Sequence, residues 1–224
     1  MIPRKARVRR RWSETPGVFT LDLALDDGQA NRFAFAPGQF NMLTVFGVGE
    51  VPISISGDPS DTKSLLHTIR DVGAVTHALD GLEAGAVLGL RGPFGTGWPL
   101  DEARGRDVVI VAGGLGLAPL RPALRGLLGQ RERFGSIVLL YGARSPDDIL
   151  FERELEVWRH RLDLKVEVTV DHAPATWRGH VGVVTTLIAR VGFDAPDTMA
   201  FVCGPEVMMR FAIKALEDAG VERE

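Results

Sequence analysis

The sequence predicts two domains, an antiparallel β-barrel over residues 1–100 and an α/β domain with a doubly wound parallel sheet over residues 101–224. Before Trp98, apolar and polar residues alternate in short runs, which is typical of half-buried strands. After Pro99, apolar runs alternate with amphipathic segments, which is typical of a parallel sheet with helices on both faces. A chain of 224 residues has room for two domains of this kind.

The strands expected in the first domain are separated by Gly, Pro and Asp turns, as in a small antiparallel barrel. Their sequences are ARVRRRW, GVFTLDLAL, GQFNMLTVF, VPISIS, SLLHTIRDV and AVLGLRG, which cover residues 6–12, 17–25, 38–46, 51–56, 64–72 and 86–92. The segment VTHALDGL, residues 75–82, has the pattern of one short helix between the last two strands.

The boundary between the two domains falls at the segment PLDEARGR, near residues 100–106. The second domain's expected strands cover residues 108–112, 136–142, 164–170 and 198–202. Its expected helices cover residues 117–129, 147–160, 183–191 and 205–219. The segment GFDAPD, residues 192–197, has the composition of a loop before the last strand.

Composition excludes several classes of protein. A net charge of −3 gives no reason to expect nucleic acid or an anionic membrane as partner. Cys203 is the one cysteine, which excludes a disulfide scaffold and an iron–sulfur cluster held by this chain alone. The five histidines lack metal-ligand spacing, and no apolar run has the ~18 residues of a membrane span. We therefore expect a cytoplasmic protein without a bound metal. The basic residues 4–11 are expected to form a solvated face, or else a docking surface for an acidic partner.

Two glycine-rich turns carry the main functional signal. Residues 108–120 read VVIVAGGLGLAPL, and residues 203–209 read CGPEVMM. Each turn places glycine between a strand and a helix, where a ligand can approach the backbone closely, and proline near the helix start. In a parallel sheet both turns lie at the carboxyl edge, so two helix N-termini favour phosphate there. We therefore expect a dinucleotide site; the alternative is that both turns only cap helices. Pro119, in place of a third glycine, argues against standard Rossmann packing.

Five motifs resemble the ferredoxin–NADP reductase superfamily. They are VPISIS (51–56), RGPFG (91–95), GGLGLAPLRP (113–122), YGAR (141–144) and VCGPEVMM (202–209). Within it, the chain is most similar to the flavin-bearing gamma subunits of cytoplasmic NAD(P)-linked nickel–iron hydrogenases (sulfhydrogenases). The B component of anaerobic sulfite reductase and the electron-transfer subunit of dihydroorotate dehydrogenase are related. The resemblance implies FAD on the barrel, NADP or NAD on the second domain, and a partner that takes electrons.

The resemblance also implies roles for individual residues. The residues expected at the flavin are Val51, Pro52, Ile53, Ser54, His67, Thr68, Ile69, Arg70, Gly73, Val75 and Thr76. Those expected at the dinucleotide are Gly113, Gly114, Gly116, Ala118, Pro119, Arg144, Cys203, Gly204, Pro205 and Met208. Ser54, bonded to flavin N5, and Cys203, beside the nicotinamide, are the expected catalytic residues.

Several of these residues also have a purely structural explanation. Ser54 is otherwise a strand residue facing solvent, His67 a surface histidine and Thr76 a helix cap. Cys203 is otherwise a small buried side chain, and Met208 part of the core.

Two departures from the superfamily pattern bear on function. Val51 and Ile53 replace the arginine and tyrosine of its flavin motif, so Arg70 is expected to supply the charge and Ile53 an aliphatic wall. The relatives also continue into a cysteine-rich segment that holds a two-iron cluster. Here the chain ends at GVERE, so the cluster lies on a missing C-terminal segment or on an iron–sulfur partner subunit of a larger redox complex.

Arg144 favours NADP, because an arginine at this position accommodates a 2′-phosphate. Asp147 and Asp148 weaken that preference. Two other functions stay open. One is a free-standing reductase of ferredoxin, flavodoxin or free flavin, and the other is a nucleotide-binding subunit without turnover.

Overall fold

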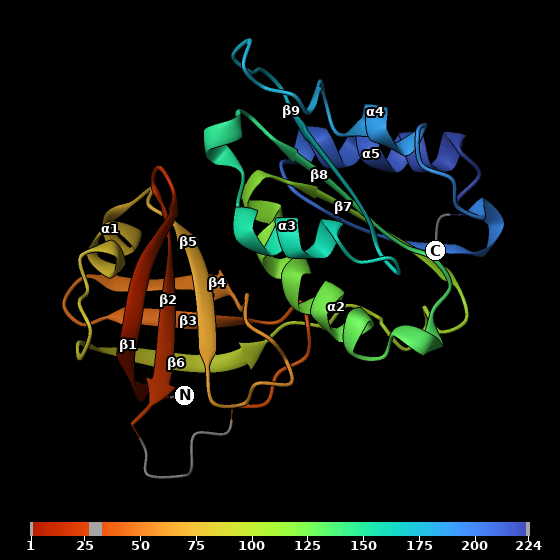
Figure 1. Cartoon of the computed structure of the whole chain (residues 1–224). Helices are drawn as coiled ribbons and strands as arrows, with labels where there is room; N and C mark the ends of the chain where they lie inside the picture. The colour runs from red at the N-terminus through yellow and green to blue at the C-terminus, as the bar shows by residue number, and fades with distance from the viewer. Residues whose placement is uncertain (1, 27–32, 223–224) are drawn as a thin grey trace. The chain divides into compact units, whose positions relative to one another are not determined.

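The computed structural model describes residues 2–26 and 33–222. By its internal contacts the chain divides into two compact units (Figure 1). The first comprises residues 1–98 with 121–126, and the second comprises residues 99–120 with 127–224. The predicted fold class is confirmed, since the first unit is built on an antiparallel sheet and the second on a parallel one.

The first unit is a six-stranded sheet in the order β4-β3-β6-β1-β2-β5. The strands are β1 (Arg4–Thr15), β2 (Val18–Leu25), β3 (Phe40–Val45), β4 (Gly49–Ser54), β5 (Leu65–Arg70) and β6 (Val87–Phe94). The two end strands meet again, because Ile55 after β4 forms an isolated bridge with His67 and the Ser56 N–H donates to the Leu66 carbonyl (2.9 Å). The sheet therefore closes into a barrel, and the predicted helix is present as α1 (Ala74–Asp80).

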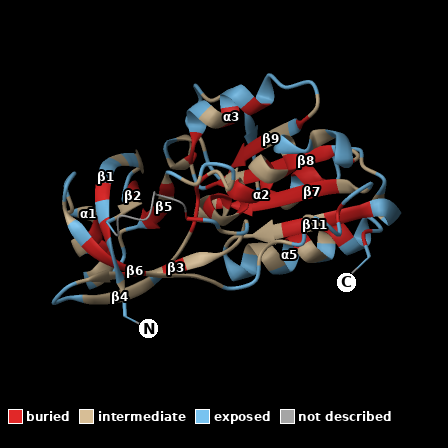
Figure 2. Ribbon diagram, turned by 90° about the horizontal axis from the view of Figure 1, so that it is seen from below, coloured by how far each residue is buried: buried red, intermediate tan, exposed pale blue. Residues whose placement is uncertain are grey.

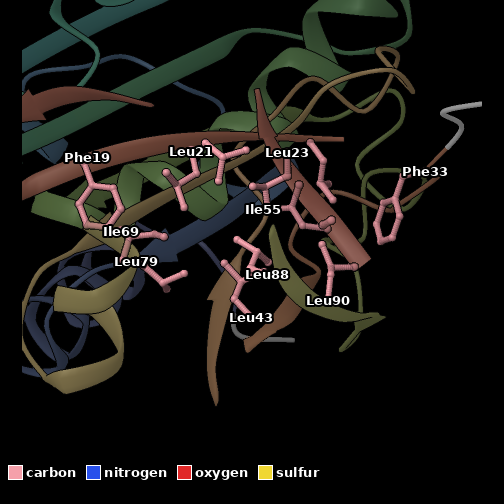
Figure 3. Close-up of a cluster of buried hydrophobic side chains, with 13 residues drawn as sticks. Phe19, Leu21, Leu23, Phe33, Leu43, Ile55, Ile69, Leu79, Leu88 and Leu90 are labelled. Carbon is pink, nitrogen blue, oxygen red and sulfur yellow. The ribbon is translucent and has the colours of Figure 1, made fainter. Parts of the chain in front are cut away.

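The barrel interior is an apolar cluster to which every strand except β4 contributes a fully buried side chain (Figure 3). On β2, Phe19, Leu21 and Leu23 enter this cluster at every second position, as strand alternation requires. Thr20 and Asp22 lie between them and are also buried, so β2 is covered on both faces. The polar residues of its second face therefore need partners inside the protein.

The basic strand β1 is largely neutralised by carboxylates of the same unit. Arg7 pairs with Asp26 (2.6 Å) and Arg10 with the buried Asp22 (3.2 Å). Arg11 bonds the carboxylate of Asp80 at the end of α1. The arginines of this strand are thus more than a solvated face, because they hold β1 to β2 and to α1.

The second unit is a five-stranded parallel sheet in the order β10-β9-β8-β7-β11. Its strands are β7 (Asp107–Gly113), β8 (Ile137–Ala143), β9 (Lys165–Val170), β10 (His180–Val181) and β11 (Thr198–Cys203). The helices of this part of the chain are α2 (Leu117–Gly129), whose residues 121–126 are counted with the first unit, α3 (Glu152–Arg159), α4 (Thr185–Ile188) and α5 (Glu206–Asp218). Figure 2 shows α3 and α5 on opposite sides of this sheet, with buried central strands between them.

The four long strands and α2 lie close to where the sequence predicts them, whereas two helices are shorter. The helix expected from residue 147 begins at Glu152, because residues 146–148 form a 3-10 turn and Phe151 has a positive φ of 56°. The helix expected over 183–191 is reduced to α4. The two-residue strand β10 has no counterpart in the prediction, since a pairing of this length leaves no periodic signal.

Candidate dinucleotide and flavin sites

The two glycine turns of the second unit lie side by side. Strand β7 ends at Gly113 and pairs in parallel with β11, whose last residue, Cys203, is in register with Ala112. Both strands therefore end at the same edge of the sheet. The prediction that these turns share one edge is confirmed, and any ligand bound there would meet both of them.

Contact between the turns explains why glycine occupies these positions. A Cβ on Gly116 would overlap the Cys203 carbonyl and come within 2.8 Å of the Gly204 nitrogen. A Cβ on Gly204 would lie 3.1 Å from the Gly113 Cα. Gly114 has a φ of 52°, a left-handed conformation that glycine adopts readily. The glycines thus serve first to let one turn pack on the other.

Helices follow both turns, and neither begins with a capping side chain. A 3-10 turn over residues 114–116 leads into α2, and Pro205 precedes α5. The first N–H groups of a helical run have no partner within it, so they attract anions when no side chain caps them. Ahead of α2 these are the groups of the 3-10 turn, because the backbone N–H at the start of α2 already donates to the Gly114 carbonyl. Pro119 lies in the first turn of α2, where its missing N–H costs nothing. Two uncapped helix ends beside a backbone-lined surface fit the pyrophosphate of a dinucleotide.

Cys203 and Met208 line the same edge. Cys203 is half-buried, and burial raises the pKa of its thiol, so the sulfur is neutral at pH 7. Met208 is half-buried on α5, and its sulfur occupies the space beside Gly113 and Gly204. A neutral thiol fits a residue that shapes a binding surface rather than one that attacks a substrate.

Arg144 is exposed directly after β8, at the same edge of the sheet. Its guanidinium makes no hydrogen bond or ion pair with the described residues, although Asp147 and Asp148 lie close in sequence. Asp148 instead accepts a bond from the Ser145 hydroxyl (2.7 Å). The Arg144 side chain is therefore available to a phosphate.

In the first unit, residues 51–54 of the VPISIS segment lie in the end strand β4, and residues 55 and 56 follow it. Val51 and Ile53 are half-buried and pack against the barrel core, whereas Pro52 between them is exposed. Proline is tolerated here because β4 has a strand on one side only within the ordered sheet. Ser54 is half-buried, and its hydroxyl has no hydrogen bond to a described residue, so it remains available to a ligand.

The expected flavin residues of β5 lie mostly inside the barrel. His67 is fully buried and is not a surface histidine; its Nε2 lies 3.1 Å from the Asn41 amide nitrogen. Burial lowers its pKa to about 3, so the imidazole is neutral. Ile69 belongs to the apolar core, and the Thr68 hydroxyl bonds other hydroxyls. On this strand Arg70 is exposed, with a guanidinium that has no partner among the described residues.

Thr76 caps α1. Its hydroxyl oxygen accepts the N–H groups of Val72 (3.0 Å) and Gly73 (2.9 Å), and its proton goes to the Gly73 carbonyl (3.0 Å). A hydroxyl has one proton and two lone pairs, so all three are in use. The side chain therefore has no capacity left for a phosphate. Val75 is half-buried and lies close to Gly49 on β4.

Three comparisons bear on what this arrangement is. The family model of the oxidoreductase NAD-binding domain matches residues 110–214, which contain both glycine turns. Sulfhydrogenase 2 subunit gamma of Pyrococcus furiosus is 35% identical over 209 residues, which cover 88% of this chain and 72% of that protein. A probable dihydroorotate dehydrogenase B electron transfer subunit of Methanocella arvoryzae is 35% identical over 223 residues, 99% of this chain and 76% of that protein.

The chain belongs to this family of ferredoxin–NADP reductase-like electron-transfer subunits. The resemblance inferred from the motifs is thereby confirmed. Solved structures agree on the fold. An Amycolatopsis cytochrome P450 reductase superposes with a TM-score of 0.82 at 25% identity, over 99% of this chain and 66% of that chain. A Neisseria gonorrhoeae ferredoxin NADP+ reductase with bound FAD and NADP superposes with a TM-score of 0.80 at 20% identity, over 98% and 92% of the two chains.

This family member has features near its expected flavin residues that sequence reasoning missed. Glu50, beside Val51, bonds the guanidinium of Arg91, and this bond lowers the pKa of the carboxyl. Asn41 reaches His67 inside the barrel, yet Asn41 Oδ1 and His67 Nδ1 have no partner among the described residues. A lone asparagine within the apolar run FNMLTV was the signal that was available.

Two further findings concern metal ligands and membrane-spanning helices. No group of three or more His, Cys, Asp or Glu side chains in residues 2–26 and 33–222 is placed to hold a metal ion. None of the helices in these ranges is both long and apolar enough to cross a membrane.

Proposed function

We propose that this chain is the FAD-dependent subunit that passes electrons between NAD(P)H and an iron–sulfur partner, in a hydrogenase- or sulfite-reductase-type complex. The observation that carries the proposal is the contact between the glycine turns, which brings two uncapped helix N-termini to one edge of the sheet. The family supports the redox role, because its members are named as sulfhydrogenase gamma and electron-transfer subunits.

In this proposal the second unit binds the dinucleotide through its backbone. The N–H groups of the 3-10 turn that leads into α2 and those at the start of α5 hold the pyrophosphate, and Gly113, Gly114 and Gly116 keep that surface free of side chains. Cys203 and Met208 form the wall beside the nicotinamide, and Ala118, Pro119, Gly204 and Pro205 complete the two turns. Arg144 takes a 2′-phosphate, so we propose NADP as the preferred cofactor.

The first unit binds the flavin along β4 and β5. The Ser54 hydroxyl supplies a hydrogen bond at flavin N5, and Ile53 supplies an aliphatic contact in place of an aromatic ring. Arg70 neutralises phosphate charge in place of the arginine of the superfamily motif, because position 51 is valine here. His67 and Ile69 shape the strand from within the barrel and Thr68 from its other face, and the backbone of Gly73 to Thr76 lies at the pyrophosphate.

Bound flavin and nicotinamide would supply the hydride and single-electron chemistry, and the residues of this chain hold and orient them. The absence of an evident acid–base pair is therefore compatible with the proposal. No thiolate is required of Cys203, in line with its raised pKa.

A conservative change between the turns tests the nucleotide site. In Gly204→Ala, the new Cβ would lie 2.8 Å from the flexible end of Met208 and displace it toward the ligand surface. We expect this variant to bind NADPH about tenfold more weakly or worse by titration calorimetry performed below its melting temperature, which the 3.1 Å approach to the Gly113 Cα should lower. Gly129→Ala is the matched control, because a Cβ there meets no atom within 4 Å. NADPH affinity equal to that of the unmodified chain would contradict the assignment.

A further inference from the structure

The second unit has a pocket at one margin of its parallel sheet, away from the carboxyl edge that carries the glycine turns. Its volume is about 530 Å³, within the ~300–1,000 Å³ of typical ligand sites. Residues 166–168 of β9 form one wall, residues 176–180 form another, and Arg159 at the end of α3 completes it.

The pocket exists because β9 is only partly paired on one side. Strand β8 pairs with β9 from Lys165 to Val170. On the other side β10 pairs with Thr169 and Val170 only, so residues 165–168 have no neighbouring strand there within the described sheet. A strand edge of this kind presents alternating N–H and C=O groups that a further strand can bond.

The loop before β10 does not fill this position, because it closes on itself. The Trp177 N–H donates to the Pro174 carbonyl (2.9 Å), and the indole N–H donates to the His180 carbonyl (3.2 Å). The indole ring lies over Gly179, where a Cβ would come within 2.5 Å of it. The loop is thus held as a separate wall, and the edge of β9 stays open.

Positive charge dominates this pocket. Arg159 and Arg178 are exposed, and neither makes a hydrogen bond or ion pair with a described residue. Glu167 is the one carboxylate of the lining, and it lies 3.4 Å from His180 Nε2. Arg190 donates to the other nitrogen of the same imidazole (2.9 Å). The lining therefore carries two arginines without a charge partner among the described residues, and its one carboxylate already faces His180.

We propose that the β9 edge at residues 165–168 binds an extended acidic peptide segment of a partner protein as an added strand. The open backbone edge favours a peptide over a small anion, because only a peptide offers a matching row of donors and acceptors. The unpaired arginines favour acidic side chains, since Arg159 and Arg178 gain the charge partners that they lack. This inference does not depend on the proposed electron transfer.

The test uses the full chain and an acetylated synthetic peptide of alternating Glu and Val residues. We expect the peptide to bind in titration calorimetry and to slow amide hydrogen exchange at residues 165–168. A peptide of alternating Lys and Val residues is the charge-reversed control and should not bind. No binding of the Glu-Val peptide, or binding without protection of this edge, would overturn the proposal.

Variants separate a strand-addition site from simple anion binding. We expect Arg159→Glu with Arg178→Glu to weaken peptide binding at least about tenfold. Arg153→Glu, on the same helix α3 but outside the lining, should leave it unchanged. Peptide affinity that is insensitive to the double variant would contradict the proposal. So would full displacement of the peptide by inorganic phosphate, which would show an anion site only.

Discussion

The side-chain position of Gly116 has room for a hydrogen atom and nothing larger, because the backbone of residues 203–204 fills the space a Cβ would occupy. At the scale of single residues, this contact explains why position 116 is glycine. Glycine is required at position 116 by the neighbouring turn at residues 203–205, and not only by a ligand. Pro119 lies in the first turn of α2, where a helix tolerates proline. The proposed nucleotide surface is therefore a consequence of backbone packing.

The charge of Arg144 gives the first prediction at this scale. Replacing Arg144 by Ala removes an unpaired guanidinium from the carboxyl edge and leaves the packing of β8 intact. Loss of a charge-assisted bond costs about 1.5–3 kcal/mol, so we expect NADPH to bind roughly ten- to hundredfold more weakly. Binding of NADH, measured by the same titration, should be unchanged. An unaltered ratio of the two affinities would show that Arg144 does not select the cofactor.

His67 gives a second prediction, on the pH dependence of stability. Its pKa in the folded protein is about 3, below the unfolded value of about 6.5. Between these values the unfolded state binds the extra proton, so this histidine makes the free energy of unfolding decrease as the pH falls. We expect urea unfolding midpoints to fall from pH 7 to pH 5, and to fall less steeply in His67→Gln. Equal slopes for the two proteins would show that His67 is not responsible.

At the scale of elements, a row of hydrogen-bonded hydroxyl groups runs from strand to strand along the barrel wall, from β1 to the segment after β4. The Thr20 hydroxyl donates to Glu14 (2.6 Å), lies 2.9 Å from Thr68, and Thr68 lies 2.8 Å from Ser56. Because each hydroxyl has one proton, Thr68 must donate to Thr20 and Ser56 to Thr68. The chain thus ties β4 to β5 at the seam where the barrel closes.

Breaking this chain in the middle gives the prediction for this scale. In Thr68→Val, Thr20 loses its donor and the buried Ser56 proton loses its acceptor. An unsatisfied buried group of this kind costs about 1–3 kcal/mol. We expect the free energy of unfolding in urea to decrease by that amount. Thr96→Val, at an exposed position outside this network, should change stability little, and equal effects of the two changes would contradict the assignment.

Sequence patterns predicted the long, packed elements well. The antiparallel strands and α2 lie near their predicted positions because alternating and 3.6-residue patterns follow burial, and the parallel strands do so because strands buried on both faces are continuous apolar runs. Tertiary contacts determine the helix boundaries and caps. The late start of α3 depends on Phe151 and the turn at Pro146, and the capping by Thr76 depends on where Gly73 lies. Periodicity predicts neither of these local geometries.

The site residues show the same division. The two glycine turns were predictable, since strand and helix patterns place them at one edge of a parallel sheet. The burial of His67 was not, because an isolated histidine in a strand has the same pattern whether it faces the core or solvent. The partner that decides the question, Asn41, lies 26 residues away in sequence.

At the scale of the whole molecule, each unit is proposed to bind one cofactor. The barrel offers Ser54 and Arg70, whose side chains have no hydrogen-bond partner among the described residues, and the α/β unit offers two helices without a capping side chain and Arg144. Electron transfer between the cofactors follows only if both bind to this chain. Val51 and Ile53 make flavin binding the critical step, since they replace two flavin contacts of the superfamily.

The most direct test is the anaerobic visible spectrum of the purified chain reconstituted with FAD, recorded before and after NADPH is added. We predict yellow flavin bands that remain with the protein after gel filtration and bleach when NADPH is added. An iron–sulfur acceptor protein should then restore them. A colourless protein that cannot be reconstituted with FAD, yet binds NADPH, would contradict the proposed electron transfer and identify a nucleotide-binding subunit without turnover.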